Sequence, residues 1–258
     1  MSTPISFCQF RVAAALLLTV VSTRAAFDQT HAGFDRLLKQ HVSDGWVDYA
    51  RLKADPKPRS AYLDQLAAVT EAEFSQWSEK ARLAFLINLY NAATLKLIVD
   101  HYPVRSIKDI GGLFSSPWKQ EAVRLFGRVT TLDAVEHDIL RKLYAEPRIH
   151  FALVYAAKGC SPLRREAYVA SRLDEQLDDQ ARLFLASQEK NRVVANERTV
   201  YLSPIFKWFA GDFEKHSGSV LTFIEPYLPE ADRRALAGHG LKIRYTDYDW
   251  SLNDRPKK

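Results

Sequence analysis

The feature that most constrains this fold is a long apolar stretch from Glu79 to His101, which is predicted to form one helix. Its residues are apolar on nearly every side, and such a helix is stable in water only when other elements cover it. About 22 residues at about 1.5 Å each give a length of about 33 Å. Pro103 stands just past the end, where it cannot continue a helix. The rest of the chain is therefore expected to pack around this helix.

The remaining sequence predicts more helices than strands. Apolar spacings of three and four residues indicate helices at 27–40, 60–69, 131–144, 171–187, 219–227 and 230–237. Alternation and turn residues indicate hairpins at 122–130 and 192–202, a buried strand at 149–156 and a last strand at 241–245. This pattern is typical of a mainly helical α+β fold with a small antiparallel sheet. With 258 residues, 47% of them hydrophobic, the chain is predicted to form a single domain over 26–258.

The first 25 residues have the pattern of an export signal. Arg11 precedes an apolar run from Val12 to Val21, and mostly small residues follow as far as Ala25. This run of about 10 residues is short of the roughly 20 that span a membrane, and no later stretch is expected to span one. We therefore predict a signal peptide over 1–25 and a mature protein in the periplasm or outside the cell, with no stable membrane span.

Charge and motifs argue against several classes of function. The formal net charge is +5, without a run of Lys and Arg interleaved with aromatic residues, so no nucleic-acid partner is expected. No glycine-rich phosphate loop follows a predicted strand, and Glu136-His137 lacks the second histidine of a helical zinc motif. We therefore expect no cofactor and no metal, and a small molecule or peptide as the partner.

Cys160 is the best candidate for a chemical centre. Removal of the signal takes away Cys8 and leaves Cys160 without a partner in the chain. Cys160 follows the predicted strand, and Ser161-Pro162 is expected to begin a helix whose positive end lies beside the sulfur. Lys158 and Arg164 add positive charge, so the reactive thiolate is favoured. The alternative is a structural cysteine that fills a gap beneath the turn.

A cysteine nucleophile needs a base, and two histidines are candidates. His137 lies on the helix predicted at 131–144 and is favoured. His150 opens the predicted strand, whose far end is about 20 Å away, so it reaches Cys160 only if the turn folds back. Glu136 points about 100° away from His137 on a helix, and we expect it to pair with an arginine or to be a solvated helix charge. The other histidines are expected at the surface (His31, His41, His216 and His239) or at a helix end (His101).

Asn88 and Asn91 are polar residues on an otherwise apolar helix. They lie three positions apart and therefore share one face. Buried amides must be hydrogen-bonded. One interpretation is that an asparagine orients the catalytic histidine, as in a Cys-His-Asn set. The other is that these amides tie down a neighbouring buried loop.

Seven blocks of the sequence resemble the bacterial and plant proteins of the domain of unknown function 547. The blocks are Phe85–Ala92, Tyr102-Pro103 with Ser106–Ile110, Glu136–Arg141, His150–Leu153, Gly159–Arg164, Tyr201–Trp208 and Tyr248–Asn253. The Cys and His blocks are compatible with thiol chemistry of the papain and transglutaminase type, by analogy alone. Two positions depart from the family: Tyr155 stands where cysteine is common, and Ser161 where proline is common. A disulfide between the strand and Cys160 is therefore not required for function here.

These residues together predict a cysteine-dependent hydrolase or acyl transferase that acts on amide or thioester bonds of a small or peptidic substrate in the cell envelope. The predicted catalytic set is Cys160 as nucleophile, His137 or His150 as base, and Asn91 and Glu136 in support; the predicted substrate-binding set is Asn88, Lys158 and Arg164, the two cations for an anionic group. The alternative is a non-enzymatic envelope protein that binds a small acidic ligand or peptide with the same residues.

Overall fold

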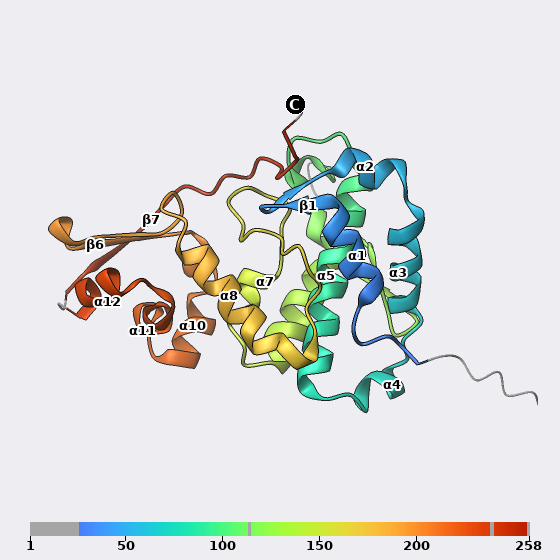
Figure 1. Ribbon diagram of the computed structural model, residues 1–258, viewed down its shortest axis with the longest axis horizontal. Helices are drawn as coiled ribbons and strands as arrows, with labels where there is room; N and C mark the ends of the chain where they lie inside the picture. Colours follow the sequence, from blue (N-terminus) through green and yellow to red (C-terminus); the bar gives the residue numbers. More distant parts are fainter. Residues whose placement is uncertain (1–25, 113–114, 238–239, 257–258) are drawn as a thin grey trace, which may run out of the picture.

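The computed structural model describes residues 26–112, 115–237 and 240–256, and helix α5 (Glu79–His101) runs through the middle of it (Figure 1). Ser78 caps the first turn, since its hydroxyl accepts the backbone N–H of Ala81, and the helix ends at Tyr102, just before Pro103. Nearly all of its side chains are buried, because α2 (Tyr49–Ala54), α3 (Lys57–Ala67) and other elements pack around it. The prediction of a central covered helix is confirmed.

Helix α5 also passes a length-and-composition test for a membrane span. Among the described helices, α5 alone is long and apolar enough to cross a membrane, and 89% of its most apolar stretch is buried inside the protein. The prediction that no later stretch reaches this length and apolarity is therefore wrong. A buried core helix meets the same criteria because it too lacks a polar face. The predicted signal peptide, residues 1–25, lies outside the described residues.

The other helices cover α5 or extend the molecule away from it (Figure 1). The remaining α-helices are α1 (Ala32–His41), α4 (Glu71–Ser75), α6 (Arg141–Leu143), α7 (Ile149–Ala152), α8 (Leu173–Leu185), α9 (Ile205–Trp208), α10 (Ala210–Ser217), α11 (Val220–Ile224) and α12 (Glu230–Ala237). Short helical turns are η1 (Ile107–Asp109), η2 (Pro117–Lys119), η4 (Ala170–Arg172), η5 (Ala195–Glu197) and η6 (Glu225–Tyr227), and η3 (Ala134–Leu140) is a π-helix. The amphipathic pattern placed most of these elements within a few residues.

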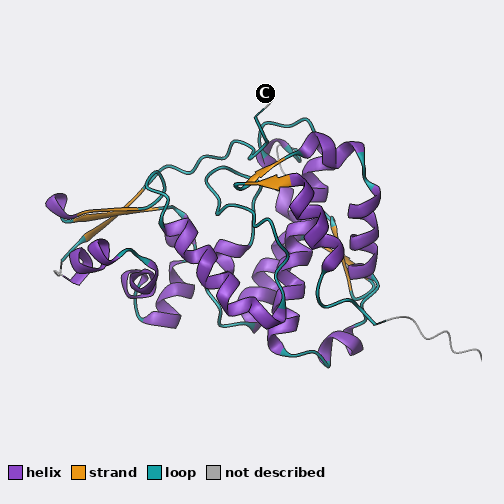
Figure 2. Cartoon of the chain, in the orientation of Figure 1, coloured by secondary structure: helices purple, strands orange, loops and turns teal. Residues whose placement is uncertain are grey.

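The strands form three small sheets (Figure 2). β1 (Val42–Ser43) pairs with β2 (Trp46–Val47), and β3 (Val123–Leu125) pairs with β4 (Arg128–Thr130). β5 (Arg192–Val194), β6 (Thr199–Leu202) and β7 (Lys242–Tyr245) form the third sheet at one end of the molecule. The mainly helical α+β class is confirmed. The strand pairs β1–β2, β3–β4 and β5–β6 are antiparallel, as expected, and β7 adds to β6 in parallel.

Two predicted elements near Cys160 are wrong. Residues 149–156 are not a strand: α7 occupies Ile149–Ala152 and an extended loop follows. A short apolar run cannot be assigned by periodicity alone, and among the described residues no neighbouring strand pairs with this one. Ser161-Pro162 begins no helix, and residues 161–169 form an extended loop in which Leu163 makes a single bridge to Gly45.

His31 is a third correction, because it is buried rather than at the surface. Its Nδ1 lies 2.7 Å from the Tyr62 hydroxyl, and its ring lies edge-on to Phe27. Burial lowers the pKa of His31 to about 4. The histidine directly precedes α1, where local polarity suggested a surface turn, but α3 and α5 cover that turn.

Candidate functional site

The loop that carries Cys160 is held in place by the C-terminal segment of the chain. The backbone N–H of Lys158 donates to the Ser251 carbonyl at 2.9 Å, and that of Gly159 donates to the Asp249 carbonyl at 2.8 Å. A Cβ at Gly159 would lie 2.9 Å from the Asp249 nitrogen, so only glycine permits this close approach. Residues far apart in the sequence therefore fix the position of Cys160.

The Cys160 side chain is a buried thiol. The residue is only 3% exposed, and its Sγ accepts the Tyr155 N–H at 3.3 Å and faces the Leu153 carbonyl at 3.6 Å. Burial raises the pKa of the Cys160 thiol; the Tyr155 N–H, the Tyr248 hydroxyl and Lys190 oppose this rise without cancelling it. The prediction of a thiolate at a helix N-terminus is therefore wrong, because no helix follows and apolar packing removes water from the sulfur.

Glu136 is buried beside two tyrosines. The π-helix η3 carries it inward, and such turns often occur at functional sites. Tyr155 donates its hydroxyl to Glu136 Oε1 at 2.7 Å, and Tyr90 donates to Oε2 at 3.0 Å. Among the described residues Glu136 makes no ion pair with an arginine, and it is 2% exposed, so neither role expected for it is correct.

His150 lies on the other side of Glu136. Its Nδ1 is 4.0 Å from Glu136 Oε1, and its Nε2 is 2.8 Å from Asp212 Oδ2. The ring stacks on Phe209 with 3.8 Å between centroids. Burial lowers the pKa of His150, so the imidazole is neutral and we assign its proton to Nε2, which faces the carboxylate. Nδ1 is then a free acceptor, and within the described chain it has no hydrogen-bond partner.

Asp212 holds His150 and is itself held by Arg141. The Arg141 guanidinium donates to both carboxylate oxygens, at 2.6 and 3.0 Å. Burial would raise the pKa of Asp212, but the hydrogen bonds from His150 and Arg141 outweigh it and hold the pKa well below its usual range. The carboxylate is therefore charged and fixes the orientation of the imidazole.

His137 lies at the edge of this arrangement and contacts it through Arg141. Its side chain is 39% exposed, with Nδ1 2.9 Å from Arg141 Nη1 and Nε2 3.8 Å from Asp133. Adjacent positions on a helix diverge, and the structure confirms this divergence for Glu136 and His137. In the described structure neither His137 nor His150 contacts the Cys160 sulfur. His150 is nevertheless the histidine that lies beside Glu136.

Three buried tyrosines, Tyr90, Tyr155 and Tyr248, are each influenced electrostatically by both Glu136 and Cys160. Burial raises the pKa of Tyr90, Tyr155 and Tyr248 well above the usual value, and the nearby Glu136 carboxylate raises each of them further. The Tyr248 hydroxyl is close enough to lower the pKa of the thiol, yet it does not meet hydrogen-bond geometry and, within the described chain, is buried without a partner.

We call these six residues the Glu136–Cys160 cluster: Glu136, Cys160, His150, Tyr90, Tyr155 and Tyr248. Trp118 packs edge-on against Tyr155 at 5.8 Å and against Trp250 at 5.7 Å. These indole rings help to exclude water, which strengthens every polar interaction beneath them.

Asn88 and Asn91 bind backbone rather than histidine. Asn88 donates to the Tyr168 carbonyl at 2.7 Å and accepts the Tyr168 N–H at 3.0 Å. Asn91 donates to the Ala152 carbonyl at 2.9 Å and accepts the Val154 N–H at 3.0 Å. The loop-tying interpretation is confirmed. The Asn91 contacts also satisfy backbone groups that a strand ladder would otherwise pair, which is why residues 149–156 need no partner strand.

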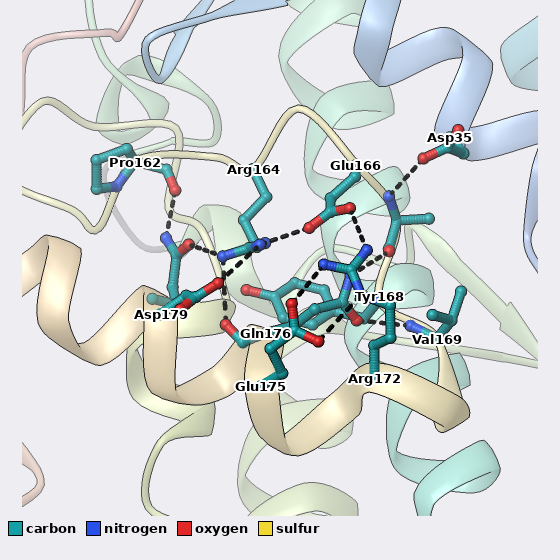
Figure 3. A network of polar contacts seen from close by, with 12 residues as sticks. Asp35, Pro162, Arg164, Glu166, Tyr168, Val169, Arg172, Glu175, Gln176 and Asp179 are labelled. Carbon is teal, nitrogen blue, oxygen red and sulfur yellow. Dashed lines mark hydrogen bonds and ion pairs between the residues drawn. The ribbon is translucent and has the colours of Figure 1, made fainter.

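The two predicted substrate-binding cations differ in their availability. Lys158 is exposed, and its ammonium lies 5.7 Å from the centre of the Trp46 ring. Arg164 is largely buried in a network with α8 (Figure 3), where it pairs with Glu166 and donates to the Gln176 carbonyl at 3.3 Å. Its guanidinium is therefore engaged in holding the loop, and Lys158 alone of the two is free to meet a ligand.

A hollow of about 330 Å³ opens beside Cys160. Trp46, Lys158, Lys190 and Asp249 contribute to its lining together with Cys160 itself. The Lys190 ammonium donates to the Cys160 carbonyl at 2.7 Å. Within the described residues no group of three His, Cys, Asp or Glu side chains is placed to hold a metal ion.

Alkylation of Cys160 should report its burial. In the folded protein at pH 8, we expect iodoacetamide to modify the Cys160 peptide at least about 100-fold more slowly than in urea, since the thiol is sealed and its raised pKa keeps it protonated. The folded-state rate should rise only above the ordinary thiol pKa of about 8.5. Peptide mapping by mass spectrometry separates Cys160 from Cys8. Rapid modification that is already at its plateau at pH 7 would show a thiolate instead.

Comparison with known proteins supports the resemblance over part of the chain. No curated protein and no solved structure matches it. The segment that carries α5, Glu136, His150 and Cys160, residues 74–185, matches the model of the family described as protein of unknown function, DUF547.

Proposed function

We propose that the protein is a cysteine-dependent hydrolase or acyl transferase that acts on amide or thioester bonds of a small or peptidic substrate in the cell envelope. The observation that supports this proposal is the Glu136–Cys160 cluster, in which a thiol, a carboxylate and an imidazole share one buried environment. Buried ionisable groups with specific partners are typical of catalytic centres. An export signal at 1–25 and a location in the periplasm or outside the cell belong to the same proposal.

The reaction begins when a substrate carbonyl enters the hollow beside Cys160. The sulfur attacks the carbonyl carbon, a C–S bond forms, and the bond to the leaving amine or thiol breaks. The thiol proton passes through a tyrosine hydroxyl to Glu136 and is returned to the leaving group. Water or an acceptor nucleophile then takes the acyl group from sulfur, and the thiol regains its proton. Because the resting thiol is protonated, proton removal accompanies the attack rather than preceding it.

In this proposal His150 and Asp212 position Glu136 instead of acting on the substrate. The neutral imidazole presents its free Nδ1 toward Glu136 Oε1, and both atoms are hydrogen-bond acceptors. A protonated Glu136 carboxyl can donate toward this nitrogen, whereas a carboxylate cannot. His150 Nδ1, 4.0 Å from Glu136 Oε1, is therefore the nearby acceptor for Glu136 after this carboxylate has received the thiol proton.

The test is acyl transfer from p-nitrophenyl acetate, followed by peptide mapping. We expect an acetyl group on Cys160 in the wild-type protein and none at this position in Cys160→Ala, with at least about a 100-fold lower rate of nitrophenol release. Thermal unfolding controls for the fold, since removing one buried sulfur costs about 1–2 kcal/mol. Equal rates in the two proteins, with acetyl groups only on lysines, would contradict the proposal.

The second candidate is a non-enzymatic protein that binds a small acidic ligand or peptide. The burial of Cys160 and the raised pKa of its thiol favour this candidate, because a structural cysteine has these properties. Under this function Cys160→Ala binds the ligand with nearly unchanged affinity and wild-type protein forms no covalent adduct. Adduct formation at Cys160 would exclude it.

A further inference from the structure

A second, larger hollow of about 720 Å³ adjoins the one beside Cys160. The two hollows share three lining residues, Asp44, Gly45 and Pro162. A Cβ at Gly45 would lie 2.6 Å from the Pro162 Cβ, so the hairpin turn and the loop touch where the hollows meet. The second hollow continues between the end of α1, the loop after Cys160 and α8, the segments that carry Lys39, Leu163 and Leu183.

This second hollow combines an apolar wall with an unpaired cation. Leu183 is 52% exposed although it is a large aliphatic residue, and Pro162 and the buried Leu163 also belong to the lining. The Arg165 guanidinium donates only to the Lys39 carbonyl, through Nε and Nη2 at 3.2 Å each. Among the described residues Arg165 makes no ion pair with a carboxylate.

The other charged groups of the lining are largely matched. Lys39 pairs with Asp35, and Glu166 accepts from Arg164 and Arg172. Asp44 lines both hollows, and among the described residues the one side-chain hydrogen bond to its carboxylate comes from the neighbouring Ser43 hydroxyl. The positive charge that remains for a ligand is therefore that of Arg165, which lines the second hollow and not the one beside Cys160. Guanidinium groups bind carboxylates through two parallel hydrogen bonds.

Side-chain contacts hold one wall of the hollow to α8. Figure 3 shows the loop bound to α8 through Arg164, Glu166 and Arg172. The Gln180 amide holds the Pro162 carbonyl and the Ser161 hydroxyl, the latter at 2.7 Å. A wall fixed in this way loses little entropy when a ligand binds.

The spacing between the hollows sets the length of the ligand. Arg165 follows Cys160 by five residues, and an extended chain spans at most about 3.3–3.6 Å per residue, so the distance along the loop is at most about 18 Å. A peptide laid along this loop covers that distance with at most about five of its own residues.

We propose that the second hollow binds the carboxyl-terminal end of an extended peptide, whose apolar last side chain packs on Leu183 and whose terminal carboxylate pairs with Arg165. The peptide bond presented to Cys160 lies at most about five residues upstream. The position of the reacting bond rests on the proposed function, whereas recognition of the terminus does not.

The test uses calorimetric titration of the full chain carrying Cys160→Ala, which prevents turnover. The probe is N-acetyl-Ala-Ala-Ala-Leu with a free carboxylate, compared with the same peptide as its carboxyl-terminal amide. We expect the acid to bind at least tenfold more tightly than the amide. Arg165→Gln should abolish this preference, and Leu183→Ser should weaken the acid and the amide about equally, by about three- to tenfold.

Two matched controls lie outside the hollow. Arg36 lies on α1, and Arg36→Gln should leave the preference for the acid over the amide unchanged. Leu143 is 70% exposed, and Leu143→Ser should leave the affinities for both peptides unchanged. Equal binding of acid and amide, or a preference that survives Arg165→Gln, would overturn the inference. If the wild-type protein shows no acyl transfer but the titration still shows the preference for the acid, the proposed chemistry is refuted and the peptide-binding inference stands.

Discussion

Glu136→Gln is expected to lower the rate of acyl transfer to Cys160 by about 100- to 10,000-fold, the range that general acid–base groups contribute. Glutamine matches the shape of glutamate but cannot take up the thiol proton. The measurement is the initial rate of nitrophenol release, with acylation read at the Cys160 peptide. Urea unfolding confirms that the variant is folded, since replacing one oxygen leaves the Tyr90 and Tyr155 hydroxyls partly paired.

The neighbouring residue supplies the control for this prediction. His137→Gln changes an exposed side chain that reaches the Glu136–Cys160 cluster only through Arg141, which keeps its two hydrogen bonds to Asp212, and we expect its rate to stay within about threefold of wild type. A large loss in His137→Gln with little change in Glu136→Gln would show that His137 is the base, as the sequence favoured, and that the cluster is only structural.

Asn91→Ala is expected to lower the free energy of unfolding by about 3 kcal/mol, because two buried backbone groups lose their partners at about 1–3 kcal/mol each. The affected groups are the Ala152 carbonyl and the Val154 N–H, which directly precede the Cys160 loop. Urea unfolding measures the change. Alkylation of Cys160 should also become faster, because this segment packs the sulfur.

Lys96→Ala is the matched control on the same helix. Lys96 pairs with Asp100 at the surface, and such a pair contributes about 0–1 kcal/mol. If Asn91→Ala costs no more than Lys96→Ala, the Asn91 amide does not hold the loop, and its contacts do not account for the absence of a strand at residues 149–156.

The sequence was most informative where a periodic pattern is long. Helix α5 has its predicted ends, Glu79 and His101, because a capping serine and a following proline mark them locally. The hairpin β3–β4 and the helix α12 were also predicted, since turn residues and amphipathic spacing are local signals. These elements need no knowledge of distant residues.

The region around Cys160 was predicted poorly because distant residues determine it. The carbonyls of Asp249 and Ser251 fix the loop, and Asn91 replaces a strand partner. A local interpretation of Gly159 to Pro162 therefore produced a helix that is not there. Burial of Glu136 also depends on a π-helix, which has no recognised sequence signature in this segment.

The candidate site was predicted in part. Cys160, Glu136 and His150 were named, and the structure places Glu136 beside His150, while Tyr155 contacts Glu136 through its hydroxyl and Cys160 through its backbone N–H. Tyr90, Tyr248 and Asp212 were missed, because a tyrosine in an apolar run or an aspartate on a short helix carries no local sign of its partner. Only the family resemblance included Tyr90 and Tyr248, within its first and last blocks.

The central claim is that Glu136, His150 and Cys160 act as one centre, and a double-variant comparison tests it most directly. Acylation rates at Cys160 are measured in Glu136→Gln, His150→Gln and the variant carrying both changes. If His150 acts by positioning Glu136, the double variant should be no slower than the slower single variant, within about threefold. Rate losses that multiply in the double variant would show two independent contributions and contradict the claim of a single centre.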